Sequence, residues 1–368
     1  MGIGPGAHAS GPPHYRRETR RAIVADKIIT FGIPCYNSAG YMDRCITSIL
    51  EGSGYADDVQ VVIVDDGSDK DETAEKADWW AERHPTLVKA VHQENGGHGM
   101  AVLAGLAAAD GLYYKVVDSD DWLDGDALAE FLDAIRRMVA REELVDLFVT
   151  RYVYDHANEG DTHSVGYTHI LPEDRPFTWG EIGHFFMSNN LLMHSLTYRT
   201  KMLRECDVPL PAHTFYVDNI YAWQPLPHCH LIYYVPVDMY HYFIGREDQS
   251  VNERVMASRV DQQLRITRVM MRCYHLYHDI PSVELRSYMV NYFVLMMAIC
   301  SIFSRLSERP DAMDDLARLW DELHDYDPRL WRRCRLGIVG QFCNLPGDAG
   351  RAITLGGYRL ANRFVKFN

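Results

Sequence analysis

Three carboxylates lie within four residues, directly after an apolar segment that predicts a β-strand over residues 113–117. The acids are Asp118, Asp120 and Asp121. Carboxylates at this spacing repel one another, and a bound cation is the natural explanation for keeping them together. A divalent ion such as Mg²⁺ or Mn²⁺ takes one or two protein carboxylates and keeps its other positions for water and phosphate oxygens. The segment therefore predicts a site for a metal ion and a diphosphate.

A structural explanation stays open beside the chemical one. The acids could form an acidic turn in which Asp121 or Asp124 caps a helix that begins near Asp126. An aspartate at such a position accepts hydrogen bonds from the first free amides of the helix. Both explanations predict a strand-to-helix turn, but only the first predicts a ligand.

The surrounding elements alternate between short apolar strands and helical patterns. Strands are predicted at residues 28–33, 59–64, 87–91, 113–117 and 144–150, and helices at 41–50, 72–82, 100–109 and 125–141. Strands and helices that alternate at this pitch are typical of βαβ units. The sequence therefore predicts an α/β fold in which a mostly parallel sheet is sandwiched by helices.

Polar or glycine-rich loops follow the first four predicted strands. Before the acidic loop come Pro34-Cys35-Tyr36-Asn37, Asp65-Asp66-Gly67-Ser68 and Asn95-Gly96-Gly97-His98-Gly99. Ligands of parallel sheets bind beyond the carboxyl ends of the strands, so we expect these loops to converge on one edge. Each loop also has a structural explanation: Ser68 or Asp69 could cap the next helix, and the glycines could serve only a tight turn.

Composition limits the classes of partner and compartment. The 368 residues carry a net charge of −14, from 37 Lys and Arg against 51 Asp and Glu, so no overall positive field favours nucleic acid as a partner. The eight cysteines show no C-x-x-C pair and no secreted-domain spacing, which indicates reduced thiols in a cytosolic protein. Residues 1–26 are rich in Gly, Pro and Arg, show no secretory signal, and are expected to be a disordered tail.

The chain is expected to become wholly helical after about residue 250, over residues 255–278, 283–307, 312–324 and 330–339. Its longest apolar run, residues 289–303, is shorter than the roughly 20 residues that span a bilayer, so we expect a buried helix. From Arg329 to the end there are eight Lys or Arg and one acid, Asp348, so this tail is +7 and the rest of the chain −21. Such a tail could meet an anionic membrane surface or pack on its parent domain.

The region between residues 152 and 242 is rich in Tyr, His and Pro, with short strand-like runs at residues 230–235 and 239–243. Aromatic rings cover sugar faces, and His or Asn side chains bond hydroxyls, so the composition fits a pocket for a polyhydroxylated molecule. A Tyr-rich structural layer would have the same composition.

Taken together, residues 27–250 resemble the family 2 inverting glycosyltransferases of the GT-A fold, of the bacterial polysaccharide and glycolipid type. The matching motifs are Ile33-Pro34-Cys35-Tyr36-Asn37, Val64-Asp65-Asp66-Gly67-Ser68-Asp69 with Thr73, Asn95-Gly96-Gly97-His98-Gly99, Asp118-Ser119-Asp120-Asp121-Trp122, Tyr216-Val217-Asp218-Asn219 and Tyr242-Phe243-Ile244-Gly245-Arg246-Glu247-Asp248-Gln249-Ser250. The resemblance implies a catalytic domain over residues 27–249, with a nucleotide-sugar half over 27–124 and an acceptor half over 125–249. Residues 250–368 would be a helical appendage that ends in the basic tail.

The resemblance also implies roles on the donor side. Asp65 would accept a hydrogen bond from the uracil of a nucleotide-sugar, and the backbone around Pro34 and Tyr36 would shape the nucleotide pocket. Asp118 would hold the ribose or sugar side, and Asp120 would hold a divalent ion, Mg²⁺ or Mn²⁺, that bridges the diphosphate. Further donor contacts are expected from Asn37, Asn95, His98 and Ser119.

On the acceptor side, the resemblance implies that Asp218 is the general base. Many members carry two acids at this position, whereas Val217 precedes Asp218 here, and Asp218 could instead cap the helix that follows it. His194, Arg246 and Gln249 are expected to contact the acceptor or the diphosphate.

We therefore expect metal-dependent, inverting transfer of a sugar, with a UDP-sugar as the favoured donor, to a glycan or lipid-linked acceptor. The Gln-x-x-Arg-Trp signature of membrane-embedded processive synthases is missing, so the expected enzyme is cytoplasmic or peripheral on the inner face of the plasma membrane. A nucleotidyltransferase of similar fold is an alternative, although residues 34–37 contain no basic side chain to hold a triphosphate. A non-catalytic scaffold subunit of a polysaccharide-assembly complex is the other alternative, and the intact acids argue against it.

Overall fold

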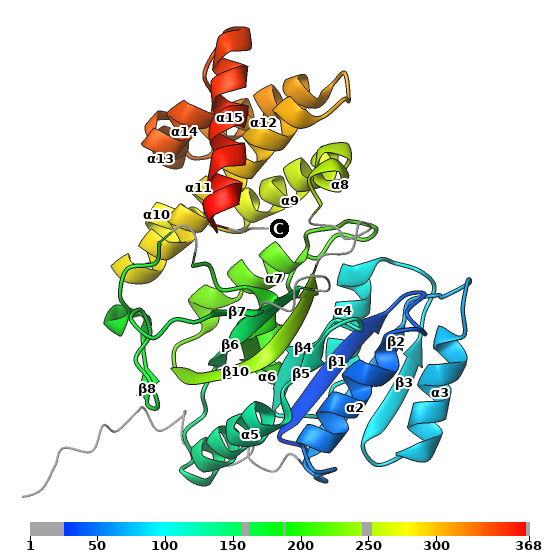
Figure 1. The fold of residues 1–368 in the computed structure, drawn as a ribbon. Coiled ribbons are helices and arrows are strands. Elements are labelled where there is room, and N and C mark those ends of the chain that lie inside the picture. Colours follow the sequence, from blue (N-terminus) through cyan, green and yellow to red (C-terminus); the bar gives the residue numbers. More distant parts are fainter. Residues whose placement is uncertain (1–25, 157–161, 187–188, 245–251, 366–368) are drawn as a thin grey trace, which may run out of the picture.

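Strands that carry the motif loops lie next to one another in a single sheet (Figure 1). The structure is a computed structural model and describes residues 26–156, 162–186, 189–244 and 252–365. Ten strands within these residues pair in the order β3-β2-β1-β4-β9-β6-β10-β5, with β7 on β6 and β8 on β10. Helices cover both faces of the sheet, and this confirms the predicted α/β fold.

The first half of the sheet is parallel, as expected. Its strands are β1 (Ile29–Cys35), β2 (Val59–Asp65), β3 (Val88–His92) and β4 (Tyr113–Val116), and its helices are α2 (Met42–Gly52), α3 (Thr73–Arg83), α4 (His98–Ala108) and α5 (Gly125–Ala140). Every residue of β1, β2 and β4 is buried, because helices cover both faces of these strands. The loops after β1, β2, β3 and β4 therefore leave the sheet at the same edge.

The second half of the sheet is mixed in direction. Its strands are β5 (Trp122–Leu123), β6 (Leu147–His156), β7 (Thr162–Val165), β8 (Pro176–Phe177), β9 (Leu196–Arg199) and β10 (Ile232–Ile244), with short turns of helix at Trp179–Glu181, Met193–Ser195 and Leu226–His228 and short helices α6 (Thr200–Glu205) and α7 (Asp218–Trp223). Strand β9 runs antiparallel to β4 and β6, whereas β6 and β10 are parallel. The sheet is therefore parallel in its first half and mixed in its second, where the long pair of β6 and β10 is also parallel.

Strand β10 differs from its prediction. Residues 230–235 and 239–243 indicated two short runs, but they form one strand whose pairing with β6 shifts register between Val235 and Asp238 and again between Asp238 and Tyr240. Such bulges bend a strand and redirect its side chains. As a result, the second part of β10 reaches the two-residue strand β5, where Tyr240 pairs with Leu123. Strand β5 was not predicted from the sequence.

One buried carboxylate ties the middle strands together. Asp146, 1% exposed, accepts hydrogen bonds from Arg199 Nε at 2.9 Å and from the backbone amides of His230 at 2.8 Å and Leu231 at 3.2 Å. These partners lie on or beside β9 and β10, and Asp146 itself directly precedes β6. Strand β6 was predicted to begin at residue 144, but it begins three residues later, at Leu147.

The region after residue 252 is helical throughout its described part. Its helices are α8 (Glu253–Ser258), α9 (Val260–Cys273), α10 (Leu276–Asp279), α11 (Val283–Leu306), α12 (Ala312–Tyr326), α13 (Pro328–Leu336), α14 (Ile338–Cys343) and α15 (Gly347–Val365). Helix α11 packs on the sheet half: Trp223 Nε1 donates to Met289 O at 3.2 Å, and the Tyr288 hydroxyl accepts from the Leu191 amide at 3.0 Å. The helical region therefore shares a hydrophobic core with the sheet.

Helix α11 is the one helix in the described residues that is long and apolar enough to cross a membrane by length and composition. Two thirds of its most apolar 18-residue window, 67%, is buried inside the molecule. This packing agrees with the predicted buried helix. The expected disordered tail, residues 1–26, lies outside the described residues except for Asp26.

Replacing Asp146 with Ala is expected to lower the free energy of unfolding by about 3–5 kcal/mol, because the change removes the ion pair with Arg199 and the acceptor of the His230 and Leu231 amides. Removal of the exposed Asp133, which pairs with Arg136, serves as the control and is expected to cost less than about 1 kcal/mol. Urea unfolding of the two variants measures the difference. Equal destabilisation would contradict the structural role given to Asp146.

Candidate active site

A cavity of about 580 Å³ opens at the carboxyl ends of β1, β2 and β4. The far wall of this cavity comes from the segment before β9, the segment before α7 and the end of β10. The polar and aromatic residues that line it are Pro34, Tyr36, Asp66, Asn95, His98, Asp118, Ser119, Asp120, His194, His213, Thr214, Phe215, Tyr216, Asp218 and Tyr242. Segments a hundred residues apart in the sequence thus face one space.

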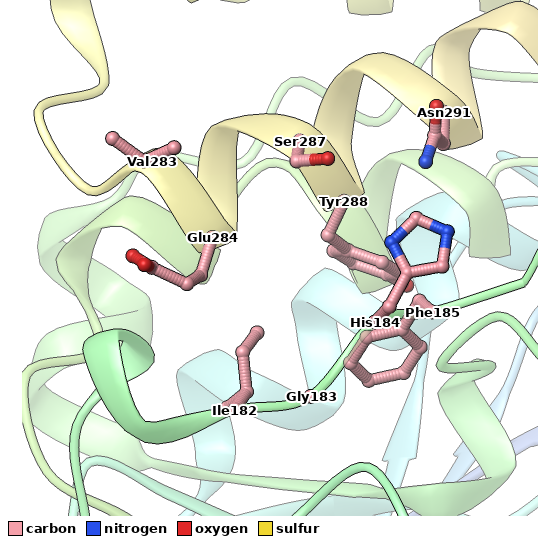
Figure 2. Close-up of a pocket in the computed structure, with 9 residues that line it drawn as sticks. All are labelled: Ile182, Gly183, His184, Phe185, Val283, Glu284, Ser287, Tyr288 and Asn291. Atoms are coloured by element: carbon pink, nitrogen blue, oxygen red, sulfur yellow. The ribbon is translucent and has the colours of Figure 1, made fainter.

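A second, smaller cavity of about 270 Å³ lies between residues 182–185 and the first turns of α11 (Figure 2). Figure 2 shows the His184 ring beside Asn291, with Glu284 and Ser287 on the same helix. This cavity contains one carboxylate, and none of the loops that follow β1 to β4 contributes to it. Chemistry between paired acids therefore belongs to the first cavity.

Asp118 is held by two histidines at the floor of the first cavity. His98 Nε2 lies 2.8 Å from one carboxylate oxygen of Asp118, and His194 Nε2 lies 3.9 Å from the other. Burial raises the pKa of Asp118, but the charge and hydrogen bond of His98, with a smaller effect of His194, outweigh burial and bring the pKa below its usual value. Asp118 is therefore ionised at neutral pH.

His98 is the cation that balances this group of acids. Burial lowers the pKa of the His98 imidazole, whereas contact with Asp118 and the nearby charges of Asp218 and Asp120 raise it, with a net rise above the ordinary value. Protonated His98 then stabilises the negative charges around it. The structure places His98 at the first position of α4, on the cavity wall.

Asp121 lies beneath the cavity and acts as a structural anchor. One oxygen accepts from the Tyr240 hydroxyl at 2.5 Å and the other from the Phe243 amide at 2.8 Å, while the Tyr240 hydroxyl accepts from the Asp118 amide at 3.1 Å. Burial, together with the charges of Asp120 and Asp118, holds the pKa of Asp121 well above its usual range. The acidic loop is therefore bound to β10.

The capping explanation for the acidic loop holds at a single residue. Asp124 caps α5, since its carboxylate accepts from the Ala127 amide at 2.9 Å. Asp121 does not cap this helix, and Asp118 and Asp120 line the cavity. The loop thus contains both the turn and the group of acids that the sequence indicated.

His194 is packed between aromatic rings at the cavity wall. It stacks on Tyr242 with ring centroids 4.3 Å apart, and burial lowers its pKa to about 4. Beneath it, the fully buried Lys115 donates to the His194 carbonyl at 2.7 Å, and burial lowers the pKa of Lys115 to about 7. The sequence analysis gave no role to Lys115 or Tyr242, although a lysine inside an apolar strand was an available signal.

Asp218, the expected base, is the first residue of α7 and faces the cavity. Burial raises its pKa above the usual value, although the charge of His98 opposes the rise. The helix has Val217 at its N-cap position without a side-chain cap hydrogen bond, so the structure does not support the capping explanation.

The segment before Asp218 is bound to the glycine-rich loop. The His213 amide donates to the Gly96 carbonyl at 2.7 Å, and Gly97, at φ +86°, leaves no room for a Cβ against His213. His213 and Tyr216 themselves adopt positive φ values of +47° and +67°. Such backbone is costly for residues other than glycine, and it orients this segment along the cavity.

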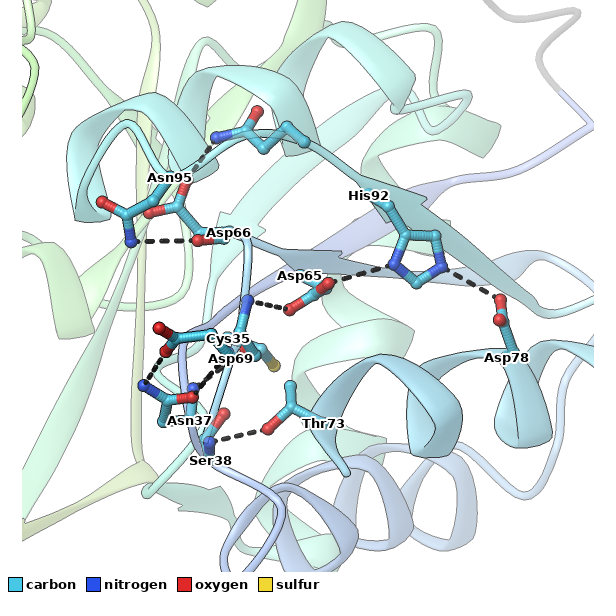
Figure 3. Close-up of polar contacts among 12 residues, drawn as sticks. Cys35, Asn37, Ser38, Asp65, Asp66, Asp69, Thr73, Asp78, His92 and Asn95 are labelled. Atoms are coloured by element: carbon cyan, nitrogen blue, oxygen red, sulfur yellow. Dashed lines mark hydrogen bonds and ion pairs between the residues drawn. The ribbon is translucent and has the colours of Figure 1, made fainter. Parts of the chain in front are cut away.

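Asp65 and its neighbour Asp66 take different positions at the end of β2 (Figure 3). One Asp65 oxygen accepts from the Ser68 amide at 3.0 Å, and the other lies 3.1 Å from His92 Nδ1. Asp78 bonds the other nitrogen of His92 at 3.0 Å, and the two acids raise the pKa of His92 against the effect of burial. Asp65 is not among the cavity-lining residues.

Asp66 lines the cavity instead and organises the glycine-rich loop. Its carboxylate accepts from Gln93 Nε2 at 2.6 Å, from the Gly96 amide at 2.9 Å and from the Gly97 amide at 2.8 Å. Asn95, also on the wall, donates to the Asp66 carbonyl at 3.0 Å. Asp66 thus reaches the cavity wall, whereas the expected partner of the nucleotide, Asp65, bonds Ser68 and His92.

Asn37 joins two loops and does not line the cavity. Its side-chain oxygen accepts from the amides of Asp69 at 3.1 Å and Lys70 at 3.0 Å, and its own amide donates to Ser68 Oγ at 2.9 Å (Figure 3). Ser68 and Asp69 therefore bind Asn37 and do not cap α3, whose N-cap is Glu72.

Most of the predicted site residues come together. The cavity is lined by Pro34, Tyr36, Asn95, His98, Asp118, Ser119, Asp120, His194 and Asp218, and Arg246 and Gln249 lie outside the described residues. Four further wall residues, His213, Phe215, Tyr216 and Tyr242, were not predicted as site residues. Tyr216 and Tyr242 belong to two of the family motifs, whereas the signal for His213 and Phe215 was only the aromatic and histidine content of the region between residues 152 and 242.

The donor atoms at the cavity floor fit a divalent cation. Ligand atoms of Asp118, Asp121 and His194 all lie within 4.8 Å of one another. Both oxygens of Asp121 already accept hydrogen bonds and its side chain is 1% exposed, whereas Asp120 lines the cavity. Carboxylate oxygens are the ligands that Mg²⁺ and Mn²⁺ prefer, so Asp118 and Asp120 are the better pair.

Comparisons with known proteins agree with this geometry. Residues 30–198 match the family model described as glycosyl transferase family 2. Chondroitin synthase of Escherichia coli is 31% identical over 178 residues, which are 48% of this chain and 25% of that protein. Glycosyltransferase GlyA of Streptococcus pneumoniae is 30% identical over 149 residues, which are 40% of this chain and 20% of that protein. The chain thus spans about a quarter or less of the length of these two relatives.

A likeness in fold extends over almost the whole chain. The crystal structure of residues 1–349 of S. aureus TarS in complex with UDP-GlcNAc superposes with a TM-score of 0.65 and covers 92% of this chain and 91% of that one, at 16% sequence identity. The match of the family model, the glycosyltransferase relatives and this shared fold point in one direction: residues 30–198 are similar to glycosyltransferase family 2, and the chain shares the fold of TarS.

Proposed function

We propose that the chain transfers a sugar from a nucleotide-sugar to an acceptor hydroxyl and inverts the configuration of the anomeric carbon. One observation carries the proposal: Asp118 and Asp120 share a cavity with Asp218, a carboxylate a hundred residues downstream. The first two acids suit the diphosphate side of a donor, and the third suits removal of a proton from the acceptor. A scaffold protein would have no use for a buried base beside such acids.

The proposed donor is a UDP-sugar. Tyr36 is 47% exposed and lines the cavity, so its ring is available to stack on a base, and Asp66 and Asn95 supply polar groups beside it. TarS, which has the same fold, was crystallised with UDP-GlcNAc, and this supports a uridine nucleotide. Among these residues Asp66 replaces Asp65 as the proposed partner of the uracil ring.

Asp120 and Asp118 would hold a divalent ion, Mg²⁺ or Mn²⁺, next to the diphosphate. Bound there, such an ion would neutralise the charge that develops on the departing nucleoside diphosphate. His98 supports the same site, because its positive charge keeps Asp118 ionised and available as a ligand.

Asp218 would take the proton of the acceptor hydroxyl while that oxygen attacks the anomeric carbon. The new carbon–oxygen bond forms on the face opposite the diphosphate, and the bond from carbon to the diphosphate oxygen breaks, so the configuration inverts. The raised pKa of Asp218 makes it a stronger base than an ordinary carboxylate. The products are the glycosylated acceptor and a nucleoside diphosphate.

The proposed acceptor is a glycan or a lipid-linked sugar. Phe215, Tyr216 and Tyr242 line the cavity near Asp218, and aromatic rings of this kind cover the apolar faces of sugars. His194 lies beside Tyr242 and would contact the acceptor or the diphosphate. All eight cysteines are free thiols, and seven of them are buried. Free thiols are typical of the reducing cytoplasm, so a cytoplasmic location is proposed.

Replacement of Asp218 with Asn is expected to reduce kcat by about 10²–10⁴-fold, since the amide cannot accept the acceptor proton. Affinity for the donor, measured by isothermal titration calorimetry with UDP, should stay close to that of the unmodified protein. Asp174→Asn is the matched control, because Asp174 is an exposed loop residue whose positive φ suits Asn as well. Unimpaired turnover in Asp218→Asn would rule out the proposed base.

Replacement of Asp120 with Asn is expected to weaken Mn²⁺-dependent binding of UDP by at least about tenfold, because a neutral amide is a poor ligand for a hard cation. Titrations with UDP, in the presence of Mn²⁺ and of a chelator, test this directly. The control is Glu130→Gln, an exposed acid on α5. Equal affinity for UDP with and without the metal would contradict the metal site, and release of pyrophosphate would indicate a nucleotidyltransferase.

The dependence of kcat/KM on pH should show an acidic limb above the range of an ordinary aspartate. Asp218 acts in its ionised form, and burial raises its pKa, so activity should fall as the pH drops through that raised value. His98 stabilises ionised Asp218, and therefore His98→Gln should move the limb to higher pH. A limb that stays in place, or moves to lower pH, in this variant would contradict the assigned coupling.

A further inference from the structure

Exposed apolar side chains gather on the last three helices. Of the large apolar residues that are exposed in the described part of the chain, five lie between residues 336 and 360: Leu336, Ile338, Phe342, Ile353 and Leu360. Ile338, the first residue of α14, is 90% exposed. Exposed apolar side chains that gather on neighbouring helices often mark a contact with another molecule or a membrane.

Helix α15 carries its share of these residues on one side. Ala349, Ala352, Ile353, Gly356 and Leu360 are all exposed and follow helical spacing, so they form a stripe along the helix. A different side of α15 packs on the molecule: Thr354 is buried and donates to the Phe342 carbonyl at 2.7 Å, and Gly357 lies against the Phe342 ring. Phe342 therefore joins the apolar end of α14 to the stripe on α15, and Figure 1 shows the two helices side by side.

The same helices carry positive charge. Between Arg329 and Leu360 there are six arginines and one acid, Asp348, which gives +5 by subtraction, against −14 for the whole chain. Arg332, Arg333, Arg351 and Arg359 are exposed. We call the surface formed by α13, α14 and α15 the terminal face.

The positive charge of the terminal face favours an anionic membrane over a second copy of this chain as its binding partner. A second copy of this chain would bring +5 against +5 and would be repelled. An anionic bilayer satisfies both features, because its phosphates attract arginines while its acyl boundary accepts Ile338, Ile353 and Leu360. The remainder of the chain, with net negative charge, would be held away from such a surface, so the molecule would dock by this end.

We propose that the terminal face binds anionic lipid membranes, with α15 in the plane of the interface. The inference goes beyond the proposed transfer reaction and does not depend on it, since no residue of the terminal face lines the cavity at the strand ends. It identifies the helices and side chains through which the basic tail would act.

Co-sedimentation of the full chain with vesicles tests the proposal. Binding is expected to vesicles of phosphatidylglycerol and phosphatidylcholine and not to phosphatidylcholine alone, and salt should weaken it. Arg332→Glu with Arg359→Glu should reduce binding at least about tenfold, because each arginine near the surface contributes to attraction. Ile338→Asn with Ile353→Gln should reduce binding by a similar factor without any change in charge.

A matched control reverses two exposed cations elsewhere, Lys89 on β3 and Arg137 on α5, and should bind as the unmodified protein does. Circular dichroism confirms that each variant is folded. The proposal is overturned if the unmodified chain does not sediment with anionic vesicles, if it binds neutral vesicles equally well, or if both terminal-face variants keep full binding. A stable dimer in sedimentation velocity that Ile338→Asn with Ile353→Gln dissociates would instead assign the face to a second copy.

Discussion

Like charges confined in a partly buried space are the constraint on which the site depends. Asp118, Asp120 and Asp218 line one cavity and Asp121 lies beneath it, and uncompensated negative charge on these acids would destabilise the fold. Different groups solve this for different acids: His98 keeps Asp118 charged, whereas hydrogen bonds from β10 accommodate Asp121. A bound cation would neutralise the remaining negative charge of Asp118 and Asp120, and Asp218 would be neutralised by the proton of the acceptor hydroxyl. The clustering of acids therefore explains both the need for compensating charge and the proposed chemistry.

The fold assembles these acids from distant parts of the chain. Parallel strands β1, β2 and β4 bring three loops to one edge, and the bulged strand β10 returns to hold the acidic loop through Tyr240. On the opposite wall, Asp218 belongs to α7, which packs against α11 through the hydrogen bond from Trp223 to Met289. The helical region thus supports the base from behind, and the two halves of the chain form one functional unit.

Much of this arrangement follows from local sequence. Strands β1 to β4 and the early helices lie within one or two residues of their predicted ends, because buried parallel strands give continuous apolar runs. Long-range effects were less accessible. Strand β5 forms through its pairing with the bent strand β10. At the end of β2, the neighbouring side chains of Asp65 and Asp66 point in different directions, and only Asp66 lines the cavity. Asn37 was predicted to contact the donor, because the sequence around it does not reveal that its side chain binds the loop containing Asp69 and Lys70. The buried Lys115 amine is stabilised by hydrogen bonds to the carbonyls of His194 and Leu196, which lie about eighty residues later in the sequence.

In the proposed mechanism, Asp218 and the acids at the strand ends act on opposite sides of the anomeric carbon, so stereochemistry is the central claim of the proposal. The most direct measurement follows the first product of UDP-sugar turnover by proton NMR, with acceptor or with water as the nucleophile, before the free sugar equilibrates. The account predicts an anomeric configuration opposite to that of the donor, formed together with UDP. A product that retains the donor configuration would contradict it.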